Sequence, residues 1–199
     1  MLPLYVHADS VAGPNFEWIW YCIPKNASRS LLRVLVNVGG VRLGKDARDR
    51  ITHQTPKLSF AFVRHPEARV ISAWRNKVLN PPPTTVKLMK SSPGLRAGMA
   101  LNDFVEWLAE ATQRKSINEH WRPQSDFVCS GDGMLVANFV GKVENLEADF
   151  EQVRIQVGTL DPIPRLNAIP SQSDEVLTAR SRDILRDIYR KDFDAFGYE

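Results

Sequence analysis

The segment CIPKNASRS, residues 22–30, combines residue types that suit the binding of an anion. It follows the strand-like run FEWIWY and precedes the helix-like run LLRVLVNV. In parallel α/β folds, ligands bind at the carboxyl ends of strands, where the start of a helix offers N–H groups and the positive end of its dipole. Lys25 adds a positive charge, and Ser28 and Ser30 add hydroxyl donors. The turn is therefore a candidate phosphate site, although a plain turn with a solvated lysine and a serine cap explains the same residues.

A second candidate anion site follows the apolar run LSFAFV, residues 58–63. Arg64 comes directly after this run, and Ser72 lies two turns into the helix expected next. Arg69, Ser72 and Asn76 are spaced to share one helix face. Arginine binds a phosphate through two parallel hydrogen bonds, and a serine hydroxyl adds another. The alternative is that the arginine pairs with a carboxylate and that the serine lies on a polar helix face. Two strand ends with anion-suited residues in one short chain nevertheless favour a polyanionic ligand.

Composition excludes several other classes of protein. The 199 residues carry a net charge of +3 with both signs mixed along the chain, whereas nucleic-acid-binding proteins show a denser basic stripe. Cys22 and Cys129 form neither a disulfide framework nor a metal-ligand spacing. No apolar run approaches the length of a membrane span, and the N-terminus lacks the regions of a signal peptide. We therefore expect a soluble cytoplasmic protein without metal or nucleic acid, of unknown oligomeric state.

The order of the apolar segments predicts a single α/β domain over residues 1–199, with a parallel central sheet flanked by helices. Strands are predicted at 16–23, 58–63 and 134–141. Helices are predicted after the turn at 24–30, at 67–79, 101–111 and 144–157, and around 174–191. Residues 38–57 are predicted to be a connector, because they carry glycines and charged residues.

Residues 81–100 contain four prolines and two glycines between two predicted helices. A loop of this length in a compact domain is usually functional or disordered. It carries Lys87, Lys90 and Arg96, with Leu88 and Met89 between them. We hypothesise a lid that orders only when the substrate is bound; the alternative is a solvated excursion.

Five motifs in this order resemble those of sulfotransferases that use 3′-phosphoadenosine-5′-phosphosulfate. The resemblance is to the carbohydrate branch that includes chondroitin and dermatan 4-O-sulfotransferases and the HNK-1 sulfotransferase. IPKNASRS is similar to the 5′-phosphosulfate loop, and FVRHPEARVISAWRNK resembles the 3′-phosphate motif RxPxxRxxSxxR. The branch is indicated by NEHWRPQSDFVC (118–129), NFVGKVENLEADF (138–150) and YRKDFDAFGY (189–198).

The resemblance implies a P-loop-like fold of three layers and transfer of a sulfuryl group to a hydroxyl without a metal. Lys25 would stabilise the leaving phosphate, and Arg64 with Ser72 would hold the 3′-phosphate. The loop that would hold the 5′-phosphate consists of Pro24, Lys25, Asn26, Ala27, Ser28, Arg29 and Ser30. The acceptor would be a carbohydrate, a glycolipid or a small alcohol.

The acceptor hydroxyl needs a general base, and histidine is suited to that role near neutral pH. We rank His120 first because it lies in the NEHW segment. His53 is the second candidate and Glu119 the third. A structural histidine packed beside Trp121 is the alternative for His120.

The chain departs from the family pattern at several points. His65 replaces the usual acid after Arg64, one cysteine of a pair near NEHW is missing, and the N-terminal anchor of animal members is absent. These departures suggest a soluble bacterial or viral relative. The Walker pattern GxxxxGK[ST] is also absent, which argues against a nucleotide kinase. A non-catalytic nucleotide-binding protein stays open as a further alternative, although Lys25, Arg64 and Ser72 are all present.

Overall fold

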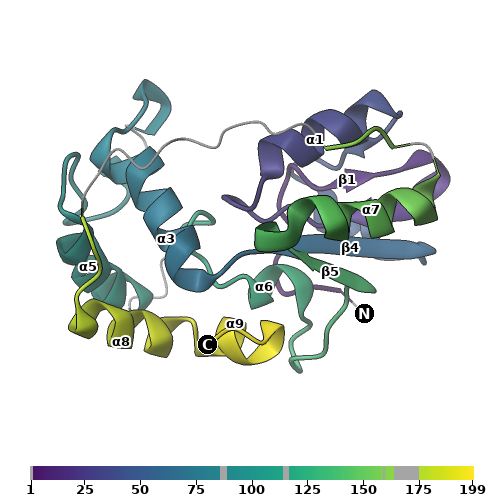
Figure 1. Cartoon of the computed structure of the whole chain (residues 1–199). Coiled ribbons are helices and arrows are strands. Elements are labelled where there is room, and N and C mark those ends of the chain that lie inside the picture. Colours follow the sequence, from purple (N-terminus) through teal and green to yellow (C-terminus); the bar gives the residue numbers. More distant parts are fainter. Residues whose placement is uncertain (1, 86–88, 114–116, 159, 164–174) are drawn as a thin grey trace. The chain divides into compact units, whose positions relative to one another are not determined.

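The computed structural model describes residues 2–85, 89–113, 117–158, 160–163 and 175–199 (Figure 1). The chain forms two compact units, each made from two stretches of sequence. The first unit comprises residues 1–64 and 124–168, and the second comprises 65–123 and 169–199. The chain therefore passes between the units three times, and the single domain expected from the length stays a prediction.

The first unit contains a five-stranded sheet in the order β3-β1-β2-β4-β5. Its strands are β1 (Val11–Ala12), β2 (Trp18–Trp20), β3 (Val41–Arg42), β4 (Leu58–Val63) and β5 (Phe139–Lys142). The strand β4 is parallel to both of its neighbours, β2 and β5, whereas β1 is antiparallel to β2 and β3. The predicted α/β class is confirmed, but the predicted sheet lacked β1 and β3, and β2 and β5 are shorter than predicted.

Both faces of the sheet are covered, because all six residues of β4 are buried. Phe60 and Phe62 on β4 and two tryptophans on β2 form a cluster on one face. This cluster packs against the helices α1 (Ser28–Asn37) and α7 (Leu146–Val157), which Figure 1 shows beside the sheet. The remaining helical segments of this unit are η1 (Pro14–Phe16), α2 (Ala47–Ile51), α6 (Ser125–Val128) and η4 (Val143–Asn145). The connector predicted at 38–57 therefore contains a short strand and a helix.

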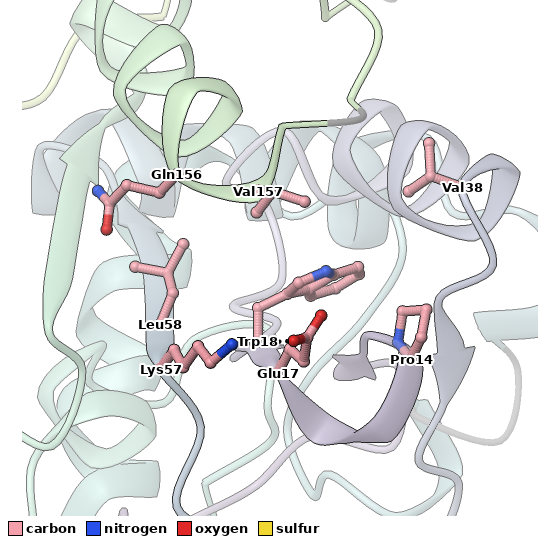
Figure 2. Close-up of a pocket in the computed structure, with 8 residues that line it drawn as sticks. All are labelled: Pro14, Glu17, Trp18, Val38, Lys57, Leu58, Gln156 and Val157. Atoms are coloured by element: carbon pink, nitrogen blue, oxygen red, sulfur yellow. Dashed lines mark hydrogen bonds and ion pairs between the residues drawn. The ribbon is translucent and has the colours of Figure 1, made fainter.

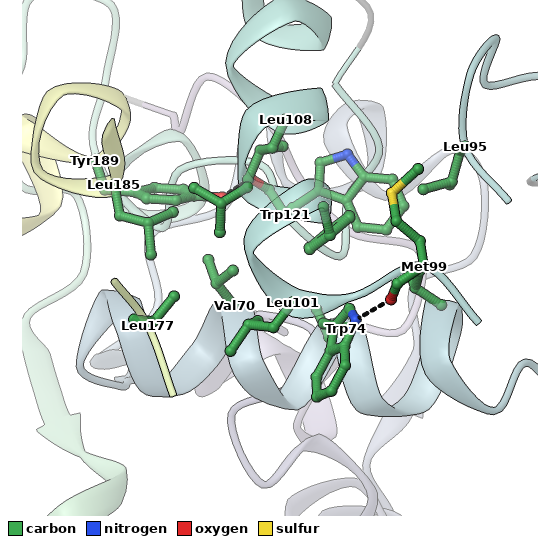
Figure 3. Packing of buried hydrophobic residues seen from close by; sticks show 14 of the residues in the cluster. Val70, Trp74, Leu95, Met99, Leu101, Leu108, Trp121, Leu177, Leu185 and Tyr189 are labelled. Atoms are coloured by element: carbon green, nitrogen blue, oxygen red, sulfur yellow. Dashed lines mark hydrogen bonds between the residues drawn. The ribbon is translucent and has the colours of Figure 1, made fainter. Parts of the chain in front are cut away.

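The regular elements of the second unit are all helical in its described part. Its elements are α3 (Pro66–Trp74), the π-helical turn η2 (Arg75–Leu79), η3 (Pro83–Thr85), α5 (Leu101–Gln113), α8 (Ala179–Ile188) and α9 (Arg190–Phe196). The apolar faces of these helices enclose one core, in which Trp74 and Trp121 are fully buried (Figure 3). The final helix, predicted as continuous around 174–191, is two helices that meet at Tyr189.

The segment predicted to be a lid packs partly into this core. Leu95 and Met99 are buried, and the N–H of Gly98 donates to the carbonyl of Val78 at 2.8 Å. The indole of Trp74 donates to the carbonyl of Met99 at 2.8 Å (Figure 3). A lid that orders only on substrate binding is therefore wrong for 95–99, because these residues complete the apolar core. Lys87 and Leu88 lie outside the described residues.

Within the described ranges, no helix is both long enough and apolar enough to cross a bilayer.

Candidate active site

The turn between β2 and α1 has an unusual backbone conformation. Lys25 has φ of +77° and Ala27 has φ of +54°, the left-handed region that residues other than glycine rarely adopt. Ala27 is the N-cap of α1, yet its methyl side chain cannot accept the hydrogen bond that a serine or aspartate would accept there. Such strain concentrates at functional sites, where the surrounding structure holds it in place. Alternation of left- and right-handed residues also turns successive N–H groups toward one concave side, which suits an anion.

Three consecutive N–H groups of this turn are available to a ligand. The N–H groups of Ala27, Ser28 and Arg29 make no hydrogen bond to any residue that the structure describes. The N–H of Asn26 already bonds the carbonyl of Ile23 at 3.3 Å, and the N–H of Ser30 bonds that of Ala27 at 3.0 Å. Within the predicted 5′-phosphate loop, the available main-chain donors are therefore these three central N–H groups. Ser28 is half-buried, whereas Ser30 is buried.

The side chain of Asn26 points into the protein and anchors the turn. It is 1% exposed, and its Nδ2 donates to the carbonyl of Phe62 at 2.8 Å and to Oε1 of Gln124 at 2.7 Å. The resemblance assigned Asn26 to the loop that would hold the 5′-phosphate. The structure shows that its amide instead ties the turn to the end of β4.

Arg64 lies at the same edge of the sheet as the turn. It follows Val63, the last residue of β4, and β4 runs parallel to β2, so that both chains leave the sheet at their carboxyl ends. The main chain of Arg64 is fixed by Gln124, whose Oε1 accepts from the Arg64 N–H at 2.9 Å and whose Nε2 donates to the Arg64 carbonyl at 2.7 Å. The arginine side chain is half-buried. The structure thus brings together the two strand ends that the sequence selected.

Ser72, Glu119 and His120 belong to the second unit. Ser72 is half-buried on α3, one turn after Arg69. Arg69 is only 1% exposed, with Nη1 donating to the carbonyl of Arg122 at 2.7 Å and Nη2 to that of Glu119 at 3.2 Å. The guanidinium of Arg69 therefore joins α3 to the NEHW segment.

Tyr189 completes this buried polar cluster. Its hydroxyl donates to the carbonyl of Trp121 at 2.6 Å, and Asp192 nearby is fully buried. Burial lowers the pKa of Arg69 from its ordinary value, while Tyr189 and Asp192 oppose that shift. Burial raises the pKa of Tyr189, which keeps its hydroxyl protonated as a donor. Three carbonyls between residues 119 and 122 are thereby held from within the second unit.

His120 is half-buried at the centre of the segment that these bonds hold. Its N–H donates to Oδ1 of Asn118 at 3.0 Å, and its ring lies 6.5 Å from that of Trp121. Trp121 is buried in the core of the second unit, so His120 is attached to a rigid neighbour (Figure 3). Glu119 is also half-buried. Both the catalytic and the structural interpretation of His120 are compatible with this arrangement.

His53 is exposed in the turn that follows α2 and precedes β4. The chain enters β4 from this turn and reaches Arg64 only at the other end of the strand. Six strand residues span about 20 Å. His53 is therefore separated from the phosphate-suited edge by the length of the strand.

A cavity of about 470 Å³ opens elsewhere on the first unit (Figure 2). Trp18, Val38, Leu58 and Val157 contribute to its lining, and an ion pair of 3.0 Å between Glu17 and Lys57 lies beside them. Trp18 and Leu58 are the first residues of β2 and β4, so the cavity is at the amino ends of these strands. It is lined by none of the residues that the sequence selected.

Sequence reasoning missed Gln124 and Tyr189, and it named Arg69 only as a residue that shares a helix face with Ser72. Gln124, Arg69 and Tyr189 hold main-chain groups, and their side chains are buried. The only signal in the sequence was that each lies within a family-like motif. In the described part of the chain, no cluster of acidic, histidine and cysteine side chains is arranged to hold a metal ion.

Comparison with known proteins gives one finding. A model of the sulfotransferase family matches residues 11–199. No curated protein and no solved structure matches the chain.

Proposed function

Because the chain belongs to the sulfotransferase family, we propose that it moves a sulfuryl group from 3′-phosphoadenosine-5′-phosphosulfate to a hydroxyl of a carbohydrate or related acceptor. Membership of the family implies a transferase with a P-loop-like α/β fold. The donor, the acceptor and the residue roles below are parts of the proposal.

The observation that carries the proposal is the turn at 24–30. It presents three successive N–H groups at the start of α1, next to Lys25, in a conformation that strains two residues. A helix start with oriented N–H groups is suited to a phosphate. In the proposal, Ala27, Ser28 and Arg29 bind the 5′-phosphate through their N–H groups, and the Ser28 hydroxyl adds a further donor.

Lys25 has the central role in the transfer step. The bond between sulfur and the bridging oxygen breaks while a bond forms between sulfur and the acceptor oxygen. Negative charge then develops on the bridging oxygen, and the Lys25 ammonium neutralises it. A preorganised charge of this kind acts mainly through electrostatic stabilisation, as in phosphoryl transfer. No metal ion takes part in this scheme.

Arg64 and Ser72 bind the 3′-phosphate, and His120 removes the proton of the acceptor hydroxyl. The bonds that Arg69 and Tyr189 make to the main chain around His120 support its rank above His53, which lies exposed at the far end of β4. Glu119 stays the third candidate base. The acceptor class rests on the resemblance of the NEHW segment alone.

The proposal is tested with the variant Lys25→Ala. We expect transfer of radiolabelled sulfate to fall by about 10²–10³ at saturating donor, since one charge contact in the transition state is lost. Binding of 3′-phosphoadenosine-5′-phosphate should change far less. Lys25→Gly is a useful second variant, because its backbone suits φ of +77° and removes the ammonium without strain. Lys57→Ala is the matched control, since Lys57 is exposed at the amino end of β4.

The first measurement is an array of polysaccharide, glycolipid and small-alcohol acceptors with labelled donor. Near-normal turnover by Lys25→Ala would contradict the assigned role. Stabilisation by ATP and Mg²⁺ instead of 3′-phosphoadenosine-5′-phosphate would indicate a nucleotide kinase. Stabilisation by 3′-phosphoadenosine-5′-phosphate without transfer to any acceptor would indicate a non-catalytic binding protein.

A further inference from the structure

One buried side chain in the first unit serves both of the strand ends that suit an anion. Gln124 directly precedes α6 and has no exposed surface. Its Oε1 accepts from the N–H of Arg64 and from Nδ2 of Asn26, and its Nε2 donates to the carbonyl of Arg64. All three hydrogen bonds measure between 2.7 and 2.9 Å.

The two hydrogen bonds between Gln124 and the main chain of Arg64 replace those that a neighbouring strand would make. β5 pairs with β4 from Phe60 to Val63, where Val63 lies opposite Lys142, the last residue of β5. Arg64 is the next residue, beyond the end of this ladder. The side-chain amide of Gln124 supplies one acceptor and one donor there, as a neighbouring main chain would. The point from which the Arg64 side chain projects is thereby fixed.

The bond to Asn26 fixes the other strand end. Asn26 stands between Lys25 and Ala27, the two residues of the turn with left-handed backbones. Its Nδ2 is held by Gln124 and by the carbonyl of Phe62, so the residue between the two strained positions cannot turn outward without losing both bonds. A strained conformation persists only where its surroundings hold it. Gln124 is one of those surroundings.

We propose that Gln124 is a positioning residue that couples recognition of the 5′-phosphate to recognition of the 3′-phosphate. This inference rests on the proposed function, because it uses the turn for the first phosphate and Arg64 for the second. Gln124 touches neither phosphate. It holds the two binding elements in register, so its loss weakens both contacts at once, whereas loss of Arg64 weakens one.

The experiment measures dissociation constants by calorimetry for adenosine 5′-phosphate, adenosine 3′-phosphate and 3′-phosphoadenosine-5′-phosphate. The main variant is Gln124→Met, which keeps the size and neutrality of the side chain and removes all three hydrogen bonds. We expect binding of the bisphosphate to weaken about tenfold or more. The two monophosphates should both bind more weakly than they bind to the natural protein.

Two further variants test the contributions of the turn and of Arg64 to nucleotide binding separately. Asn26→Leu removes the bonds on the side of the turn and leaves the Gln124–Arg64 pair, so it should weaken adenosine 5′-phosphate and spare adenosine 3′-phosphate. Arg64→Ala should do the reverse. Gln156→Met on α7 is the matched control, because Gln156 is exposed and should leave all three constants unchanged. Circular dichroism at the temperature of the titration establishes that each variant is folded.

The outcomes separate the inference from the function on which it rests. Suppose that Arg64→Ala weakens only binding of adenosine 3′-phosphate. If Gln124→Met then changes no dissociation constant, or changes that of one monophosphate alone, the coupling role is overturned and the proposed function stands. If the natural protein binds none of the three nucleotides, both the proposed function and the inference fail. Should Gln124→Met not fold, amide hydrogen exchange of the natural protein decides: binding of adenosine 5′-phosphate should slow exchange of the Arg64 N–H, whose hydrogen bond Gln124 accepts, and an unchanged rate overturns the coupling.

Discussion

Lys25 and Ala27 show how single residues combine a cost in stability with a gain in binding geometry. A left-handed backbone costs a residue other than glycine roughly 1–2 kcal/mol. Many phosphate-binding loops avoid this cost with glycines, but this turn has none between residues 22 and 30. The cost is offset by the anchors of Asn26, which are buried hydrogen bonds to β4 and to Gln124.

We predict that Ala27→Gly stabilises the protein. Glycine adopts φ of +54° without strain and is a better N-cap than alanine. Part of this gain is lost because glycine makes the unfolded chain more flexible. The free energy of unfolding should therefore rise by roughly 0.5 kcal/mol, measured by urea denaturation. Ala148→Gly, on the exposed side of α7, is the control and should lose about 0.5–1 kcal/mol. Equal losses in both variants would contradict a strained Ala27.

Residue types identified part of the candidate site, but not the residues that hold it. Lys25 and Arg64 stood out because two positively charged residues follow two predicted strands, at ends that meet on one edge of a parallel sheet. Gln124 could not be found in this way. Its importance depends on which main-chain groups lie within 3 Å, and an uncharged amide in a polar segment gives no sign of that.

At the scale of elements, the segment 138–150, which resembles a family motif, has a packing role. Gly141 on β5 faces Phe62 so closely that a Cβ atom would lie 2.5 Å from its ring. Asp149 on α7 accepts a hydrogen bond from the N–H of Lys142 at 2.6 Å. Gly141 and Asp149 thus join α7 to the edge strand β5. They make no contribution to the donor site in the proposed scheme.

We predict that Gly141→Ala destabilises the first unit. The added methyl group would meet Phe62 and would lie 3.0 Å from Cβ of Asp149, so a rigid ring or α7 must shift. Overpacking of this kind costs typically 1–3 kcal/mol. Thermal denaturation followed by circular dichroism measures the effect. Gly131→Ala is the control, since its Cβ would meet only Leu4 at 3.7 Å and should change stability by less than about 0.5 kcal/mol. A similar loss in both variants would refute the packing role.

The elements were predictable where their pattern was long. β4 was predicted with its observed bounds, because a short run with five apolar residues out of six is typical of a strand buried on both faces. β1 and β3 have two residues each, which is too short for any periodicity to show. The segment 134–138 was predicted as strand from its composition, yet the ladder with β4 begins only at Phe139.

At the scale of the whole molecule, both units bury a phenol whose ionisation opposes folding. Burial raises the pKa of Tyr21 in the first unit to about 12 and raises that of Tyr189 in the second. Above pH 10 an unfolded tyrosine loses its proton while the folded one keeps it. The folded state then binds more protons, so stability is complete below pH 10 and falls as the pH rises.

We predict that the free energy of unfolding falls by roughly 2 kcal/mol between pH 10 and 12 because of Tyr21 alone. Urea denaturation at a series of pH values, followed by far-ultraviolet circular dichroism, measures this slope. Tyr21→Phe should flatten it, since phenylalanine cannot ionise. The same slope in the variant and in the natural protein would show that Tyr21 is not responsible.

The division into two units could not be predicted from composition, because no linker marks it. Arg64 and His65 are neighbours within one family motif, and yet they fall in different units. Hydrophobic periodicity describes elements one at a time, whereas a unit is defined by which distant stretches share a core.

The hydrogen bonds between Gln124 and Arg64 have a topological consequence. These two residues bound the stretch 65–123, which leaves the first unit after Arg64 and re-enters it at Gln124. Arg64, where the chain leaves the first unit, and Gln124, where it re-enters, are therefore hydrogen-bonded to each other. Insertions, deletions or substitutions within residues 65–123 therefore leave the spacing between Arg64 and Gln124 unchanged. Replacement of the helices between Arg64 and Gln124 would leave these two hydrogen bonds in place, but it would also change the core that those helices share with α8 and α9.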